Sequence, residues 1–312
     1  MRTTPGVGSS HPSPRDHHVA PDDFLIRSLK SRWRDYREEF ERCQKRFSKD
    51  AVHDVRIAIR RLLATLGLLG SVLPPEHIHL AGRALKKRLK IFARLRDTHA
   101  QLLYVEKLRR AFPTAGCYHD ALNRRERRLI RRVRRRLPRA KDERLAESVS
   151  ALKEQLRALA KDHVRAWDGF AAVIAALRAA FAEVARRHRA IRPIDTTTIH
   201  RTRVAFKKFR YMTEALQPLL PGVTRRKLEA MRDYQTRMGD IQDIEVLLAD
   251  LDKFIAKQGD ESKPWAGLRA ELLCRRAALI RRFLAFSDKL NQFSSIPPSN
   301  SARRIAVRKS KQ

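Results

Sequence analysis

Residues 52–74 read VHDVRIAIRRLLATLGLLGSVLP, and residues 199–221 read IHRTRVAFKKFRYMTEALQPLLP. The two stretches align without a gap at an offset of 147 residues. The aligned positions of matching chemistry are His53 with His200, Arg56 with Arg203, Arg60 and Arg61 with Lys207 and Lys208, and Pro74 with Pro221. A second match follows at an offset of 146 residues, where LRD at 95–97 corresponds to IQD at 241–243. We therefore expect two halves of one plan, each a helical bundle.

Apolar residues in both stretches recur at the spacing of an α-helix and form one stripe. The stripe positions are Val55, Ile59, Leu62, Leu66, Leu69 and Leu73 in the first stretch, and Thr202, Phe206, Phe209, Thr213, Leu216 and Leu220 in the second. Similar patterns, interrupted by prolines and capping residues, predict helices over about 22–47, 51–72, 76–112, 118–137, 141–190, 197–217, 222–257 and 264–290. No alternating run bounded by hairpin turns occurs. The predicted fold class is all-α.

Composition at the two ends of the chain predicts where the helical domain begins and ends. The first 20 residues are rich in proline, glycine, serine and histidine, and we expect a flexible tail over 1–20. A basic, flexible tail is expected over 291–312. The helical domain then covers 21–290, with its first half over about 21–165 and its second half over about 166–290.

The charge of the chain limits the class of partner. There are 69 lysines and arginines against 34 aspartates and glutamates, a formal net charge of +35. A compact chain with this charge repels itself and concentrates anions at its surface. The expected partner is therefore a polyanion: nucleic acid, polyphosphate or an anionic membrane surface. The alternative is a soluble basic protein without a specific anionic partner.

Cysteine usage and hydropathy indicate the compartment. Cys43, Cys117 and Cys274 are odd in number and widely separated, and they form no CxxC pair and no metal-binding spacing with histidine. This pattern favours a reducing compartment. No run approaches the ~18 apolar residues that a membrane-spanning helix needs, and no apolar signal segment follows Met1. We expect a cytoplasmic protein with no membrane insertion, no metal and no cofactor.

Each repeated helix also carries a cationic edge that is separate from its apolar stripe. At about 100° per residue, His53, Arg56 and Arg60 share one edge. The matching edge of the second repeat holds His200, Arg203, Lys207 and Arg210, with Tyr211 beside them. Arginine binds phosphate oxygens two at a time, lysine adds a mobile charge, and histidine donates hydrogen bonds. Both edges are predicted to bind anions; the alternative is an ordinary solvated helix face.

The third predicted helix of each half adds further cations. They are Arg83, Lys86, Lys87, Arg88, Lys90 and Arg94 in the first half and Arg225, Arg226, Lys227, Arg232 and Arg237 in the second. We assign Lys87, Lys90 and Arg94 to the binding surface. Asp97 and Asp243 are expected to orient an arginine or histidine rather than to act as catalytic acids. The densest basic run, 124–139, either extends the binding surface or forms an exposed helix face.

These motifs resemble those of the CHAD family, the conserved histidine α-helical domain. The resemblance rests on VHDVRIAIRR at 52–61, IHRTRVAFKKFRY at 199–211, LRD at 95–97 and MGDIQDIEVLL at 238–248, and it covers about residues 22–290. It implies two four-helix bundles related by a pseudo-twofold axis. It also implies non-enzymatic binding of inorganic polyphosphate between the bundles, and for some members a location at polyphosphate granules. The residues carried over by motif are His53, Arg56, Arg60, Arg61, His200, Arg203, Lys207, Lys208, Arg210 and Tyr211.

Two other functions stay open from the sequence alone. Nonspecific nucleic-acid binding is the main alternative, because phosphate contacts dominate there too. No homeodomain, zinc-finger, RNP or basic-zipper motif occurs, and 3 tryptophans and 5 tyrosines are few for a base-stacking platform. A phosphatase or phosphotransferase with His53 or His200 as nucleophile is the third candidate. Neither a P-loop nor an RHG triplet nor an acidic metal cluster accompanies these histidines.

Overall fold

The computed structural model describes residues 21–137, 143–161, 163–258 and 263–294. These residues form α1 (Pro21–Lys45), α2 (Lys49–Leu69), α3 (Pro75–Glu106), α4 (Thr114–Arg136), α5 (Glu143–Ala160), α6 (His163–Arg189), α7 (Thr196–Leu216), α8 (Arg225–Ile255) and α9 (Ala266–Leu284), with 3-10 turns η1 (Gln217–Leu219), η2 (Lys263–Trp265) and η3 (Ser287–Phe293). In the described ranges the only β-type pairing is an isolated bridge between Arg192 and Asp195. The prediction of an all-α fold is confirmed. The predicted tail over 1–20 and most of the one over 291–312 lie outside the described residues.

Local sequence signals explain where the helices that carry the repeated motifs begin. The Ser48 hydroxyl accepts a hydrogen bond from the backbone N–H of Ala51 at 3.2 Å and caps α2. The Asp195 carboxylate accepts from the N–H of Thr197 at 3.0 Å and caps α7. Pro75 stands at the first position of α3, where a missing N–H costs nothing. These caps fix the start of each helix and hence the direction of its side chains.

Two predicted helix boundaries differ from the structure. The stretch predicted as helical over about 141–190, inside which the two halves were expected to divide near residue 165, forms two helices, α5 and α6, and α5 ends at Ala160. The helix predicted to reach residue 112 ends at Glu106. It is followed by tight turns, in which the N–H of Leu108 donates to the carbonyl of Val105 at 2.9 Å. Leu108 is buried in this turn, so packing at the tip of the α3–α4 pair ends the helix early.

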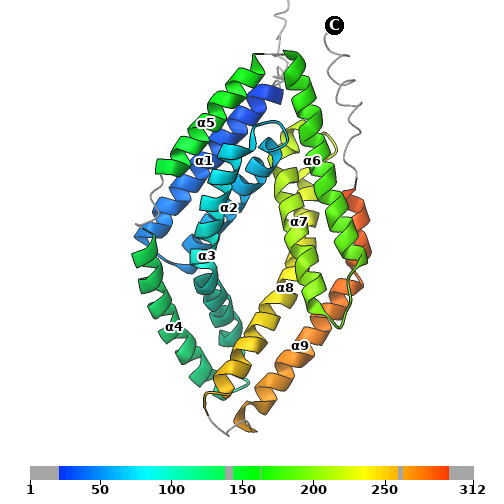
Figure 1. Ribbon diagram of the computed structural model, residues 1–312. Coiled ribbons are helices and arrows are strands. Elements are labelled where there is room, and N and C mark those ends of the chain that lie inside the picture. The colour runs from blue at the N-terminus through cyan, green and yellow to red at the C-terminus, as the bar shows by residue number, and fades with distance from the viewer. Residues whose placement is uncertain (1–20, 138–142, 162, 259–262, 295–312) are drawn as a thin grey trace, which may run out of the picture.

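The helices of the two repeats meet in the centre of the molecule (Figure 1). On one side α1, α2, α3 and α5 pack together, and α4 packs along α3. On the other side α6, α7, α8 and α9 pack in chain order. The halves join where α2 packs on α7 and where α3 meets α8. Corresponding helices have nearly equal lengths, 21 residues each for α2 and α7 and 32 and 31 for α3 and α8.

The apolar stripes predicted for the two repeats are buried, as expected. The larger core includes Ile59 and Leu62 of α2 and Phe206 and Phe209 of α7, so both halves share it. A second, smaller core lies where the far ends of α3 and α4 meet those of α8 and α9, and it includes Trp265. Because both cores contain residues of each half, neither half is packed independently of the other.

The two threonines in the second apolar stripe are satisfied inside their own helix. The Thr202 hydroxyl donates to the carbonyl of Thr198 at 2.9 Å, and the Thr213 hydroxyl donates to the carbonyl of Phe209 at 3.0 Å. Hydrogen-bonded hydroxyls can be buried at little cost, so these positions keep their place in the core. Among the described helices, none has both the length and the apolar character that crossing a bilayer requires.

An aromatic cluster anchors the end of the described chain to α7 and α8. The ring of Phe206 lies 4.8 Å from that of Tyr234 and 5.7 Å from that of Phe293, centroid to centroid. Phe293 belongs to η3, so the helical fold extends beyond residue 290, the expected end of the domain. Ring pairs at these separations add to the stabilisation that burial provides.

We predict that Phe206→Ala lowers the free energy of unfolding by about 3–5 kcal/mol, because it removes a fully buried ring and leaves a cavity. Denaturant unfolding followed by circular dichroism measures the change. As a control, Leu103→Ala truncates a side chain that is 53% exposed and should cost less than about 0.5 kcal/mol. Equal effects of the two substitutions would contradict a shared core centred on α7.

Candidate anion-binding site

A cavity of about 1290 Å³ lies between α2 and α3 of one half and α7 and α8 of the other. This volume exceeds the roughly 300–1,000 Å³ of most small-molecule pockets. Of the predicted site residues, ten line the cavity: His53, Arg56, Arg60, Arg61, His200, Arg203, Lys207, Lys208, Arg210 and Tyr211. The matched edges of the two repeats therefore face one space, which the repeat alone could not establish.

Three predicted residues on α3 lie elsewhere. Lys87, Lys90 and Arg94 are exposed and do not line the cavity. The cavity is instead lined from α3 by Lys86, Arg96 and other residues of the same arc. At 100° per residue, Lys87 stands about 100° further around the helix than Lys86. Choosing among the cations of α3 therefore requires knowing which arc the packing turns inward.

Several cavity residues were not among those assigned from the sequence. They are His79, Arg83, Lys86, Arg96 and Arg232, together with the aspartates Asp97, Asp240 and Asp243. A signal for Arg96 exists, because it belongs to the LRD motif that aligns with IQD in the second half. From the sequence, Asp97 of that motif was expected to orient an arginine or histidine. In the structure Arg96 beside it crosses the cavity and contacts Asp243 of α8.

The lining is strongly cationic. Counted over the described residues, eleven lysines and arginines and three histidines line the cavity, against three aspartates. Clustered like charges between low-dielectric walls raise the local potential and concentrate anions. The walls are partly apolar as well, with Leu63, Leu66 and Val204 among the lining residues. The cavity therefore combines a surplus of positive charge with limited solvation of that charge.

Ion pairs across the cavity join the two halves. Arg96 of α3 donates two hydrogen bonds to the Asp243 carboxylate of α8, at 2.8 and 3.1 Å, and a third to Asp97 at 3.3 Å. A two-point contact of this kind fixes both position and orientation. Although burial lowers the pKa of Arg96, its hydrogen bonds and the charges of Asp243 and Asp97 raise the pKa above the ordinary value. Both aspartates thus orient an arginine, the role expected from the sequence.

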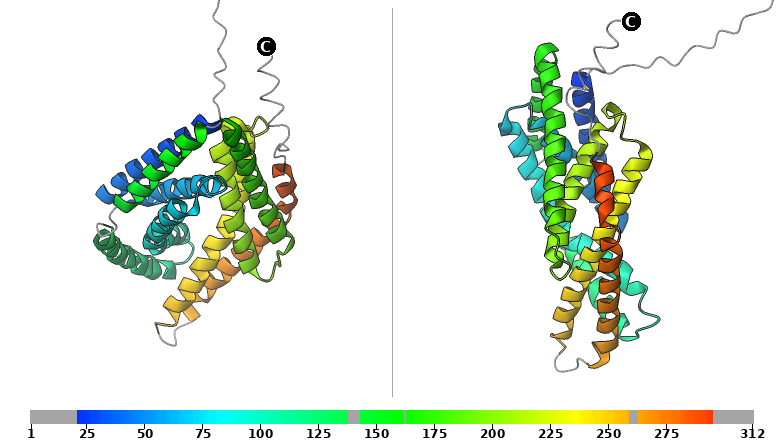
Figure 2. Two further views of the ribbon diagram at one scale, coloured as in Figure 1. Left: turned by 45° about the horizontal axis from the view of Figure 1, so that its top comes forward. Right: turned by 90° about the vertical axis from the view of Figure 1, so that its right-hand side faces the viewer.

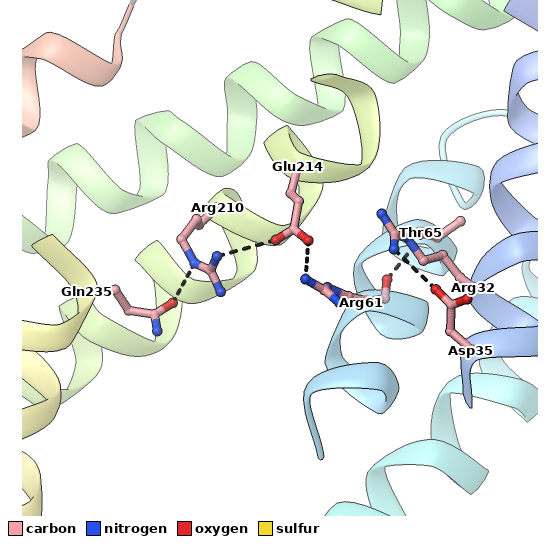
Figure 3. A network of polar contacts seen from close by, with 7 residues as sticks. All are labelled: Arg32, Asp35, Arg61, Thr65, Arg210, Glu214 and Gln235. Atoms are coloured by element: carbon pink, nitrogen blue, oxygen red, sulfur yellow. Dashed lines mark hydrogen bonds and ion pairs between the residues drawn. The ribbon is translucent and has the colours of Figure 1, made fainter. Parts of the chain in front are cut away.

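A second cross-link lies on Glu214 of α7 (Figure 3). One of its oxygens lies 2.7 Å from a guanidinium nitrogen of Arg61 of α2, and the other accepts a hydrogen bond from Arg210 at 3.3 Å. Arg210 also donates to the Gln235 amide oxygen at 2.9 Å and lies over the ring of Tyr211 at 4.2 Å. Arg61 and Arg210 are therefore neutralised in part and hold the wall of the cavity.

Other cavity cations have no acid within ion-pair distance among the described residues. Arg56 is 8% exposed and donates to the backbone carbonyl of Leu89 at 2.9 Å. Burial, with the charges of Arg60 and Arg96, lowers the pKa of Arg56 to about 9. Burial also lowers the pKa of Arg203. These arginines remain charged at neutral pH, and their charges oppose one another.

Lys207 shows the consequence of this crowding most clearly. Burial, together with the charges of Arg60 and Arg203, lowers the pKa of Lys207 to about 5. The amine is therefore uncharged near pH 7 when no anion is present. An anion placed among Arg60, Arg203 and Lys207 would favour the charged form and draw a proton to the amine.

Unsatisfied donors point to the same ligand chemistry. The Nε atoms of Arg61 and Arg203 are buried and have no hydrogen-bond partner in the described structure. Buried donors of this kind are rare and costly unless something accepts from them.

The two predicted histidines differ in their surroundings. Desolvation, followed by the charge of Arg203, lowers the pKa of His200, whose side chain forms a hydrogen bond with Gln242. His53 is exposed at the rim of the cavity.

The fold and the cavity define an all-helical protein whose two halves enclose a cationic space. The chain belongs to the CHAD domain family, whose model matches residues 27–252. The crystal structure of the CHAD domain from the plant Ricinus communis is similar, with a TM-score of 0.63 and 18% identity over 88% of this chain and 92% of that one. PptA from Streptomyces chartreusis is similar with a TM-score of 0.57 and 16% identity over 87% and 99%. Both likenesses concern the fold. No curated protein matches the sequence.

We predict that Lys207→Met raises the melting temperature of the anion-free protein at pH 7 by a few degrees. The unfolded lysine binds a proton up to about pH 10.4, whereas the folded one loses it above about pH 5. Between these values the unfolded state binds more protons, so the penalty from Lys207 is full below pH 5 and declines as pH rises. The advantage of the variant should therefore shrink from pH 6 to pH 9.

The control for this experiment is Lys87→Met, which removes an exposed lysine outside the cavity. Differential scanning calorimetry across the same pH range compares the two variants. A Lys207→Met advantage that is absent at pH 7, or that grows with pH, would show that this amine is not destabilised by its neighbours.

Proposed function

We propose that this protein binds inorganic polyphosphate in the cavity between its halves and does not process it. The observation that carries the proposal is a group of crowded basic side chains that have no paired acid among the described residues: the buried Arg56, the partly buried Arg60 and Arg203, and the partly buried Lys207, whose amine is uncharged near pH 7 until an anion binds. Such a group is unfavourable until an anion joins it. A linear chain of phosphates supplies oxygens at regular intervals and can contact both repeated edges at once.

The burial of these groups favours a slender ligand. Arg56 and Lys207 lie inside the cavity, where the phosphates of a rigid duplex could not easily reach them. Single-stranded nucleic acid is usually held by aromatic rings on which bases stack. The one aromatic residue in the described lining is Tyr211, which is 5% exposed and covered by Arg210. A polymer of phosphate without bases fits this lining better.

Membership of the CHAD domain family supports the same ligand, because the resemblance implies polyphosphate binding and, for some members, a location at polyphosphate granules. A binding role also agrees with the histidines. His200 is held by Gln242 beside Arg203 and does not form a nucleophile–base pair with a described acid. We therefore place His53 and His200 among the phosphate-binding groups.

The double variant Arg56→Ala with Arg203→Ala tests the site. Charge-assisted hydrogen bonds contribute about 1.5–3 kcal/mol each, so losing two should raise the Kd for long-chain polyphosphate by roughly 100-fold or more. Isothermal titration calorimetry at about 0.15 M salt, where exposed charges are screened, gives the affinity. Circular dichroism should show unchanged helicity.

The matched control is Arg281→Ala with Arg282→Ala, which removes the same charge from the exposed end of α9. We expect a change in Kd of less than about threefold for this pair, since exposed charges contribute little at this salt concentration. If the two double variants lose affinity equally, total charge alone governs binding and the cavity has no special status.

Competition with duplex DNA distinguishes the proposed ligand from nucleic acid. We expect long-chain polyphosphate to displace labelled DNA at about 0.15 M salt, because contacts to exposed charges weaken steeply with salt. Arg56→Ala with Arg203→Ala should reduce polyphosphate binding while changing DNA binding little. A variant that loses DNA binding to the same extent, with DNA the stronger competitor, would identify nucleic acid as the ligand instead.

A further inference from the structure

The outer face of α4 carries the densest group of exposed arginines in the described chain. Two of the arginines on this helix have local partners: Arg125 lies 2.6 Å from Asp250, and Arg134 lies over the ring of Phe47 at 5.7 Å. The others, which we call the α4 arginine face, are exposed and have no ion pair with a described residue: Arg124, Arg127, Arg128, Arg131, Arg132, Arg135 and Arg136.

Helical spacing arranges these side chains in two parallel rows. Arg124, Arg128, Arg132 and Arg136 are four residues apart along one row, and Arg127, Arg131 and Arg135 follow the same spacing along the next. Successive guanidinium groups in a row are therefore ~6 Å apart along the axis, and the face is ~18 Å long. The opposite side of α4 is apolar and buried through Leu122, Leu129 and Val133.

The α4 arginine face differs from the other exposed helix surfaces. On other helices some exposed arginines pair with an acid three residues away, as Arg157 does with Glu154 and Arg186 with Glu183. Others, such as Arg281 and Arg282, have no ion pair with a described residue but do not form so long a run. α4 carries two acids: Asp120, four residues before Arg124, forms no ion pair with that arginine, and Glu126 lies 3.0 Å from buried His99 on the inner side. Like charges at this spacing destabilise a helix, so this run of seven exposed arginines repels itself along the helix.

The α4 arginine face is separate from the cavity. No described residue of α4 lines the cavity. α4 packs along the outer side of α3 (Figure 2) and meets α8 where Arg125 contacts Asp250. The face offers arginine forks for phosphate oxygens and no exposed aromatic ring for a base. It also lacks the exposed apolar stripe with which a helix enters a membrane surface, because its apolar side is packed in the fold.

We propose that the α4 arginine face is a second binding surface for a linear phosphate polymer, which a long polyphosphate chain contacts while another part of it occupies the cavity. This inference rests on the proposed function of the cavity. Binding at one surface raises the effective concentration of the same chain at the other, so affinity increases without new contacts at either site. A short chain fills the cavity alone. The protein thereby prefers long chains.

The test compares Arg128→Gln/Arg131→Gln/Arg135→Gln with a control triple, Lys257→Gln/Arg281→Gln/Arg282→Gln, whose residues are exposed and lie outside α4. Glutamine keeps helix propensity close to that of arginine. The probes are inorganic triphosphate and long-chain polyphosphate. We expect the α4 triple to lose at least about tenfold in affinity for the long chain and less than about twofold for triphosphate. The control triple should lose less than about threefold for either probe.

Two results would overturn the inference. One is an equal loss of long-chain affinity in the α4 triple and the control triple, which would show that the α4 arginine face acts only through its contribution to the net charge. The other is a loss of duplex DNA binding in the α4 triple with long-chain polyphosphate binding retained. A different variant tests the proposed function of the cavity: Arg56→Ala with Arg203→Ala should weaken the binding of both triphosphate and long-chain polyphosphate. The two proposals can therefore fail independently.

Discussion

The repulsion among three crowded arginines, Arg56, Arg60 and Arg203, is the constraint on which the rest of the structure depends, and together with burial it keeps the Lys207 amine uncharged near pH 7. The helices that carry them pack directly on each other, so these charges cannot move apart without separating the halves. The shared core and the ion pairs of Arg96 with Asp243 and Arg61 with Glu214 oppose that separation. The few acids of the region thus hold the walls, and the cations between them stay available for an anion.

The fold could be predicted closely from the sequence because its signals are local. Helical periodicity, the break at Ser48 to Asp50 and the Pro74-Pro75 pair located most helices within a few residues of their observed ends. The errors arose where distant packing decides. Leu108 is buried at the tip of the α3–α4 pair, just after α3 ends at Glu106. No short-range sequence pattern predicts this burial. The equal lengths of α2 and α7 agree with the repeat, whose origin by duplication stays a prediction.

The residues that line the cavity were predictable where they follow the repeat and less so where they do not, and their binding of an anion stays a prediction. The edges of α2 and α7 were identified because two copies of one pattern stood at one offset, and the residues assigned on them line the cavity. On α3 the repeat matched around LRD at 95–97 and gave no counterpart for the cations before it. Lys87, Lys90 and Arg94 were chosen by charge, whereas packing turns the arc of Lys86 and Arg96 inward. The low pKa of Lys207 could not be predicted either. Burial lowers it, as do the charges of residues such as Arg60 of α2 and Arg96 of α3, and these residues come together only in the fold.

The most direct measurement is the pKa of the Lys207 amine by NMR, with and without long-chain polyphosphate. In the free protein the pKa of Lys207 should lie far below the ordinary lysine value of about 10.4, near the value of about 5 that its surroundings impose, and polyphosphate should raise this pKa strongly. An ordinary pKa in the free protein, or one that polyphosphate leaves unchanged, would show that the cavity neither confines its cations nor receives the anion.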